Sequence, residues 1–153
     1  MKEAKFVDTS INKSIAELLS KRDHSTLVIW ATDCAEHVLP YFEEKCPNDS
    51  RPRKAIEAGR AWVRGEIAMS EARTAAFATH AAARDTDQAA ARAAARAAGH
   101  AAATAHVAGH AVHAATYAAK AATYAAGTTD ANANTDKERN WQYQHLLDLG
   151  DNH

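Results

Sequence analysis

The feature that most constrains this chain is a long alanine-rich region, in which roughly half of positions 72–126 are alanine. Alanine has the highest intrinsic helix propensity, but its side chain buries little apolar area. A core built from it must gain stability from helix backbones that approach one another closely. The sequence therefore predicts an all-α fold, a compact bundle of about six to seven helices with close-packed alanine-rich helices.

The 153 residues predict one helical domain that buries a core without metal or disulfide support. Residues 1–9 are expected to form a flexible N-terminus. Cys34 and Cys46 are expected to be reduced, because they lie about 18 Å apart along what reads mostly as one helix. The first residues are charged and no apolar run reaches the length of a membrane span. A cytoplasmic protein without membrane contact is the expectation.

Apolar residues at helical spacing predict four helices in the first half of the chain, over residues 10–20, 25–45, 51–65 and 70–84. Pro40 should kink or limit the second of these helices. Gly65 is expected to stop the third, and Ser70 to cap the fourth.

In the second half, one helix over residues 87–126 would be about 60 Å long, which is too long for a compact domain. We expect a break, with Gly99 as a C-terminal cap and Thr104 starting the next helix. The polar residues 127–134 predict a loop. Thr135 and Glu138 then fit a capping box for a final helix that carries Trp141.

The alanine-rich helices each carry one narrow stripe of longer side chains. Two stripes contain mainly arginine, and they consist of Arg73, Phe77, His80 and Arg84, followed by Gln88, Arg92 and Arg96. The third consists of His106, His110, His113, Tyr117, Lys120 and Tyr124. Arginine stripes are typical of solvated faces. Histidine and tyrosine rings suit a partly desolvated surface, so the third stripe is the predicted partner-binding surface.

A second candidate group is Asp33, Glu36 and His37, which lie on adjacent turns of the second predicted helix. They could contribute to partner binding, or they could form a hydrated face or a buried polar pair. The predicted partner-binding residues are thus His106, His110, His113, Tyr117, Tyr124, Asp33, Glu36 and His37.

His106 and His110 are the weak candidates for a metal site, because they lie one helical turn apart. No carboxylate accompanies them, which excludes a metalloprotease motif of the HExxH type. We therefore expect no metal and no cofactor. An alternative function remains open, in which the bundle binds a metal ion or a small anionic ligand through a His/Arg cluster.

Other classes of function are disfavoured. The sequence lacks a Gly-rich phosphate loop and a recognisable nucleophile motif, so no enzyme is expected. A formal net charge of −1 disfavours nucleic acid as a partner, although nine basic residues could form a surface for it. These are Arg51, Arg53, Lys54, Arg60, Arg64, Arg73, Arg84, Arg92 and Arg96. An outer alanine surface would offer a seam for a homodimer.

Several segments together resemble a known family. They are residues 30–40 (WATDCAEHVLP), 51–66 (RPRKAIEAGRAWVRGE), 99–110 (GHAAATAHVAGH) and 138–142 (ERNWQ). Their order is similar to that in small bacterial immunity proteins linked to polymorphic-toxin systems, over about residues 27–149. The resemblance implies an all-helical, non-enzymatic cytoplasmic protein that neutralises a cognate toxin by direct binding. It implies no particular toxin and no residue roles.

Overall fold

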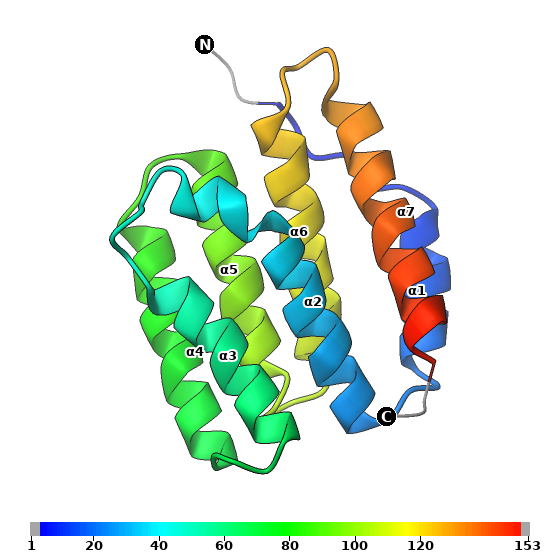
Figure 1. The fold of residues 1–153 in the computed structure, drawn as a ribbon. Helices are drawn as coiled ribbons and strands as arrows, with labels where there is room; N and C mark the ends of the chain where they lie inside the picture. The colour runs from blue at the N-terminus through cyan, green and yellow to red at the C-terminus, as the bar shows by residue number, and fades with distance from the viewer. Residues whose placement is uncertain (1–3, 151–153) are drawn as a thin grey trace.

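The computed structural model describes residues 4–150, and over this range it contains seven helices and no strand (Figure 1). The all-α prediction is confirmed. The helices are α1 (Ile11–Leu19), α2 (His24–Glu43), α3 (Arg51–Val63), α4 (Met69–Arg84), α5 (Ala89–Ala103), α6 (His110–Ala125) and α7 (Ala131–Leu149).

Helices α4, α5, α6 and α7 pack side by side in chain order, each against the next (Figure 1). Helices α2 and α3 lie across one face of this row, α3 against α4 and α5, and α2 against α5 and α6. Helix α1 packs against α7. The opposite face of α4, α5 and α6 carries no covering helix among residues 4–150, so side chains there are available to a ligand.

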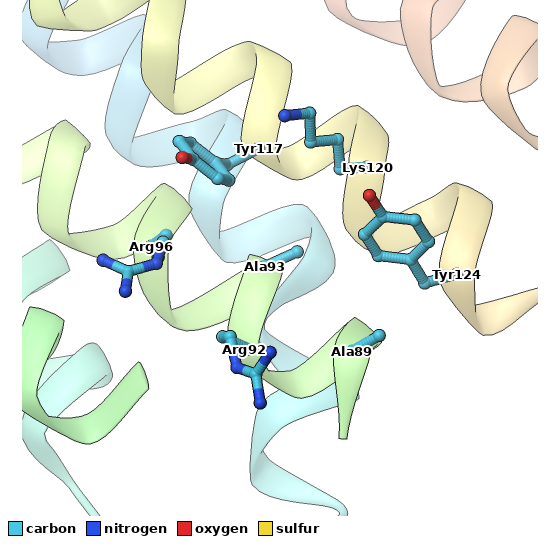
Figure 2. Close-up of a pocket in the computed structure, with 7 residues that line it drawn as sticks. All are labelled: Ala89, Arg92, Ala93, Arg96, Tyr117, Lys120 and Tyr124. Atoms are coloured by element: carbon cyan, nitrogen blue, oxygen red, sulfur yellow. The ribbon is translucent and has the colours of Figure 1, made fainter. Parts of the chain in front are cut away.

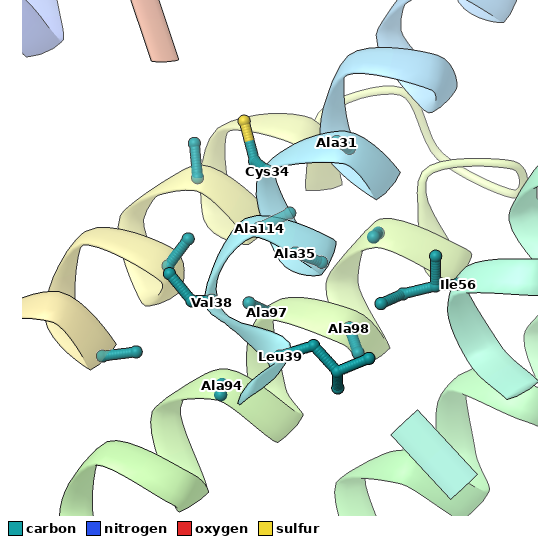
Figure 3. Close-up of a cluster of buried hydrophobic side chains, with 14 of the residues drawn as sticks. Ala31, Cys34, Ala35, Val38, Leu39, Ile56, Ala94, Ala97, Ala98 and Ala114 are labelled. Atoms are coloured by element: carbon teal, nitrogen blue, oxygen red, sulfur yellow. The ribbon is translucent and has the colours of Figure 1, made fainter. Parts of the chain in front are cut away.

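The core lies where α2 meets α5 and α6, and it combines large side chains with alanine. Val38 and Leu39 of α2 lie against Ala94 and Ala97 of α5, and all four are buried (Figure 3). The indole of Trp30, also on α2, donates a hydrogen bond to the Gln142 carbonyl (2.9 Å). Alanine on α5 permits this close packing, because a methyl group keeps the helix axes near one another. The alanine surface that could serve a homodimer is thus largely used inside the molecule.

The helices of the first half begin and end close to the predicted residues. Helix α2 continues through Pro40 to Glu43. Gly65 ends the α3 region with a positive φ of 74°, as expected for a glycine stop. Ser70 is not the cap of α4, because the helix begins at Met69 with Ala68 in the capping position.

The predicted position of the break in the second half is wrong. Gly99 lies inside α5, and the chain leaves the helix only at Thr104, whose hydroxyl donates to the His100 carbonyl (2.8 Å). Gly99 leaves room for the His80 ring, since a Cβ added at this position would stand 2.6 Å from Cε1 of His80. Helix α6 begins at His110. His106 therefore lies in the connecting loop and is not part of the helical stripe.

The predicted loop over residues 127–134 and the capping box that follows it are also wrong in their positions. Helix α7 already begins at Ala131. The Thr135 hydroxyl donates to the Ala131 carbonyl one turn back (2.8 Å), and Glu138 pairs with His37 of α2. Both residues therefore serve contacts inside the bundle instead of a helix start.

Residues 4–9 form irregular chain ahead of α1. Asp8 is held there by Arg139 of α7, whose Nε and Nη2 atoms donate to the two carboxylate oxygens (2.9 and 2.8 Å). The remaining part of the expected flexible N-terminus, residues 1–3, lies outside the described residues. Cys34 and Cys46 are free thiols, as expected. Within residues 4–150, no helix is both long and apolar enough to cross a membrane.

Candidate functional site

A cluster of four histidines lies on the open face of α4, α5 and α6. His100 of α5 is at its centre, with the ring centroids of His80 (5.0 Å), His110 (5.1 Å) and His113 (5.4 Å) around it. The ring of Tyr117 stacks on His100 at 5.3 Å. The Nδ1 atoms of His100 and His110 are 2.9 Å apart, which requires that one ring donates to the other. The cluster joins three helices through contacts between aromatic rings.

Sequence reasoning missed His100, although a signal was present. Arg92, Arg96 and His100 follow one another at steps of four, so the second stripe continues one turn further than we predicted. Gly99 directly precedes His100 on α5, so it lies beside the second stripe. His80 fits over Gly99, which places the stripes of α4 and α5 in contact.

Three histidines of the cluster have a lowered pKa. Burial, with His80, His110, His113 and Arg96 nearby, lowers the pKa of His100 from 6.5 to about 3. Burial also lowers the pKa of His80, with Arg96 and Arg84 adding to the effect. The pKa of His110 is lowered by burial and by the neighbouring histidines. At neutral pH the rings of His80, His100 and His110 are therefore polar but uncharged.

Next to the cluster, a surface groove of about 200 Å³ lies between side chains of α5 and α6 (Figure 2). Ala89 and Ala93 of α5 line one side, and Tyr117, Lys120 and Tyr124 of α6 the other, with Arg92 and Arg96 at the border. Tyr117, Tyr124, Lys120 and Arg96 are half-buried. The groove exists because small residues on α5 face large residues on α6. Arg92 is exposed, as expected for a solvated stripe, whereas Arg96 is half-buried at the border of this groove.

His106 does not join these residues. It is exposed in the loop between α5 and α6, with its Nδ1 atom 3.0 Å from the sulfur of Met69. The proposed metal pair is therefore separated, since His110 faces His100. No group of three or more His, Cys, Asp and Glu side chains in residues 4–150 has the arrangement to hold a metal ion.

The second candidate group, on α2, is engaged in ion pairs with other helices. Arg60 of α3 donates to Asp33 (2.8 Å) and to Glu36 (2.9 and 3.1 Å). The other oxygen of Asp33 lies 2.8 Å from Nε2 of His145 on α7. The Arg60 guanidinium lowers the pKa of Glu36 mainly through this hydrogen bond. These contacts join α2 to α3 and α7.

His37 belongs to the same α2 to α7 junction. Its Nδ1 atom lies 2.7 Å from a carboxylate oxygen of Glu138, and its ring stacks on Trp141 at 3.8 Å. Trp141 in turn stacks on His145 at 4.9 Å. Burial raises the pKa of Glu138, while His37 partly opposes that shift. The structure thus brings His37, Asp33 and Glu36 into one network.

The two predicted groups lie on different faces of the molecule. Helix α2 packs across one side of α5 and α6, and the groove opens on the other side (Figure 2). Tyr117 lies on the open face, whereas Tyr124 also lines a second groove with Tyr41 of α2, and Tyr41 lines another with His37. A contact surface that continues from the open face past Tyr41 would therefore include both Tyr124 and His37.

The basic residues also divide between the two faces. The four arginines of the α3 region form ion pairs with carboxylates, namely Arg51 with Asp49 and Asp85, Arg53 with Glu43, Arg60 with Asp33 and Glu36, and Arg64 with Glu66. In contrast, no carboxylate of residues 4–150 forms an ion pair with Arg92 or Arg96 of α5. The nine basic residues therefore do not act as one free cationic surface.

Comparison with known proteins identifies one family. Its description is Imm-5 like putative immunity protein, and its sequence pattern matches residues 17–149. No curated protein and no solved structure matched the chain significantly. The match extends from α1 to the end of α7, and so it includes both the histidine cluster and the groove. Since the match covers most of the 153 residues, this chain belongs to the Imm-5 like immunity protein family.

Proposed function

We propose that this protein is a cytoplasmic, non-enzymatic immunity protein that neutralises a cognate bacterial toxin by binding it directly. Membership of the immunity family over residues 17–149 is the observation that carries the proposal. The open face of α5 and α6 is the proposed contact surface, with His110, His113, Tyr117 and Tyr124 on it.

The chemistry of this face supports the assignment. Tyrosine and arginine are enriched among the residues that dominate binding energy in protein interfaces. Tyr117 is already held in place by its stack on His100, so little side-chain entropy is lost when a partner contacts it. His110 and His113 present rings that are polar, and the low pKa of His110 leaves it without a charge to desolvate at neutral pH.

Asp33, Glu36 and His37 are less suited to binding, because their polar atoms already have partners inside the molecule. A toxin that used them would have to replace the contacts with Arg60 and Glu138. We therefore propose that this group mainly joins α2 to α3 and α7. His106, exposed in its loop, is proposed as a peripheral contact at most.

The test begins with a search of the neighbouring reading frames for a secreted protein with a C-terminal toxin domain. We expect the wild-type protein to restore growth when it is produced together with that domain, and to form a complex measurable by calorimetry. The double substitution His110→Ala and Tyr117→Ala should weaken the complex at least about tenfold, because such anchors each contribute more than about 1 kcal/mol.

The matched control is Tyr143→Ala, which truncates a half-buried tyrosine of α7 away from the groove. Thermal melting of each variant must show that the fold is retained. Failure of the wild-type protein to restore growth would contradict the proposed function. An affinity unchanged in the double variant would contradict the proposed surface.

A further inference from the structure

The groove between α5 and α6 is lined by positively charged side chains and, within the described residues, by no carboxylate. Arg92, Arg96 and Lys120 surround it, and no carboxylate of residues 4–150 lines it or pairs with any of the three. The α3 arginines, by contrast, all have carboxylate partners. Three cations line the groove and no carboxylate of the described residues does, so an anion that entered it would be attracted by all three.

The cations are held in place by contacts that leave donors available. Arg92 donates from Nε and Nη2 to the Thr86 carbonyl (3.2 and 2.9 Å), and within residues 4–150 its Nη1 has no hydrogen-bond partner. The ammonium of Lys120 lies 4.9 Å from the ring centre of Tyr117 and 5.6 Å from that of Phe6. These aromatic contacts position the ammonium without neutralising its charge.

The size of the groove restricts the anion. Its volume of about 200 Å³ is below the roughly 300–1,000 Å³ of pockets that enclose a drug-sized ligand. A nucleotide would extend beyond it. The end of an aspartate or glutamate side chain would fit inside it, while the rest of its chain lay along the histidine cluster. In Figure 2 the Tyr124 hydroxyl is directed along α6 toward Lys120, at the mouth of this space.

We propose that the groove formed by Arg92, Arg96, Lys120, Tyr117 and Tyr124 is a carboxylate-binding site that accepts an acidic side chain of the protein partner. The identity of the partner rests on the function proposed above. The anion site itself does not, and it can be tested on the isolated chain. Arginine and lysine form charge-assisted hydrogen bonds to carboxylates that are stronger than bonds between neutral groups.

The experiment is an NMR titration of the full chain with two separate probes at equal ionic strength, a capped tetraglutamate peptide and inorganic phosphate. We expect the peptide to shift backbone amide signals of α5 and α6 around Ala93 and Lys120 in a saturable way. The double substitution Arg92→Met and Lys120→Met should weaken peptide binding at least about tenfold. The charge-preserving pair Arg92→Lys and Lys120→Arg should retain most of it.

The control pair is Lys54→Met and Arg64→Met, which removes two exposed cations of the α3 region and should leave peptide affinity unchanged. Absence of saturable peptide binding would overturn the proposal, and so would equal affinity in the groove and control variants. Saturable binding of phosphate alone would overturn the assignment to a carboxylate.

Measuring the toxin complex with the same variants separates the two proposals. If the groove variant loses the peptide but keeps full toxin affinity, the carboxylate does not come from the toxin and the occupant proposed here is wrong, whereas the immunity function stands. If the wild-type chain binds the peptide and fails to protect cells, the immunity function is wrong and the anion site stands.

Discussion

The imidazole of His80 lies directly over Gly99, and this contact brings the histidines of three helices together. At the residue scale, the result is a set of rings that take up protons less readily than free histidine, because burial and neighbouring positive groups disfavour the charged form. The cluster therefore couples protonation to folding. His100 contributes most to this coupling, because its pKa is lowered to about 3.

The first prediction concerns pH. The pKa of His100 is lower in the folded than in the unfolded chain, so the unfolded chain binds protons first, and stability falls as pH decreases from about 6.5 toward about 3. His100→Gln should reduce the loss of melting temperature between pH 7.5 and pH 5.5. The check is thermal unfolding followed by circular dichroism at both values.

His106→Gln is the control for this prediction, because His106 is exposed in the loop after α5 and lies outside the cluster. Its loss of melting temperature over the same interval should be closer to that of the wild type than the loss in His100→Gln, because His106 is the last of the causes that lower the pKa of His110. An equal loss in His100→Gln would contradict the role assigned to the cluster.

At the element scale, glycine sets how closely helices approach. A Cβ added at Gly59 of α3 would lie 2.8 Å from Cγ2 of Thr32 on α2. Thr32 is fully buried, and its hydroxyl donates to the Val28 and Ile29 carbonyls, so its side chain has little freedom to move. Gly59 therefore belongs to the α2 to α3 contact and not to a turn.

The second prediction compares two glycines. Gly59→Ala should lower the free energy of unfolding by about 1–3 kcal/mol, because overpacking at Thr32 outweighs the gain in helix propensity. Gly109→Ala should change it by less than about 0.5 kcal/mol, since nothing lies within 4 Å of the added Cβ and its φ is −60°. Urea denaturation measures both. A neutral Gly59→Ala would refute the close contact.

At the scale of the whole molecule, one buried ion pair joins segments far apart in sequence. Arg139 has only 3% of its side chain exposed, and it donates to Asp8, to Gln142 (3.0 Å) and to the Thr116 hydroxyl (3.2 Å). The chain ahead of α1 is thereby attached to α7 and α6. Breaking this pair should loosen that attachment.

The third prediction follows from the unequal burial of the two partners. Asp8→Ala leaves the buried guanidinium without its carboxylate, which should cost up to about 3–5 kcal/mol. Arg139→Met leaves Asp8, whose side chain is 25% exposed and can be hydrated, so the cost should be about 1–3 kcal/mol. Urea midpoints with equal m-values test the order. A larger loss for Arg139→Met would contradict this account.

Local sequence was sufficient for much of the fold. Alanine content and apolar spacing predicted an all-α bundle, and Gly65 marked the end of α3, because helix propensity and glycine stops depend on neighbouring residues alone. Family-like segments were also recognisable in the sequence. The expected break within residues 87–126 exists, since the length of a helix is limited by the size of the domain.

Tertiary structure decided what local signals could not. A glycine in the sequence can either end a helix or make room for a side chain of a neighbouring helix. At Gly99 the packing of α4 on α5 selects the second role, because the His80 ring lies over it. Thr135 and Glu138 have the spacing of a capping box, yet Glu138 is used by His37 across the α2 to α7 contact. Whether a stripe is solvated or lines a groove depends on which helix lies beside it. The sequence therefore determined which side chains share a helix face, and the helix packing determined that Arg92, Arg96 and Lys120 meet at one groove.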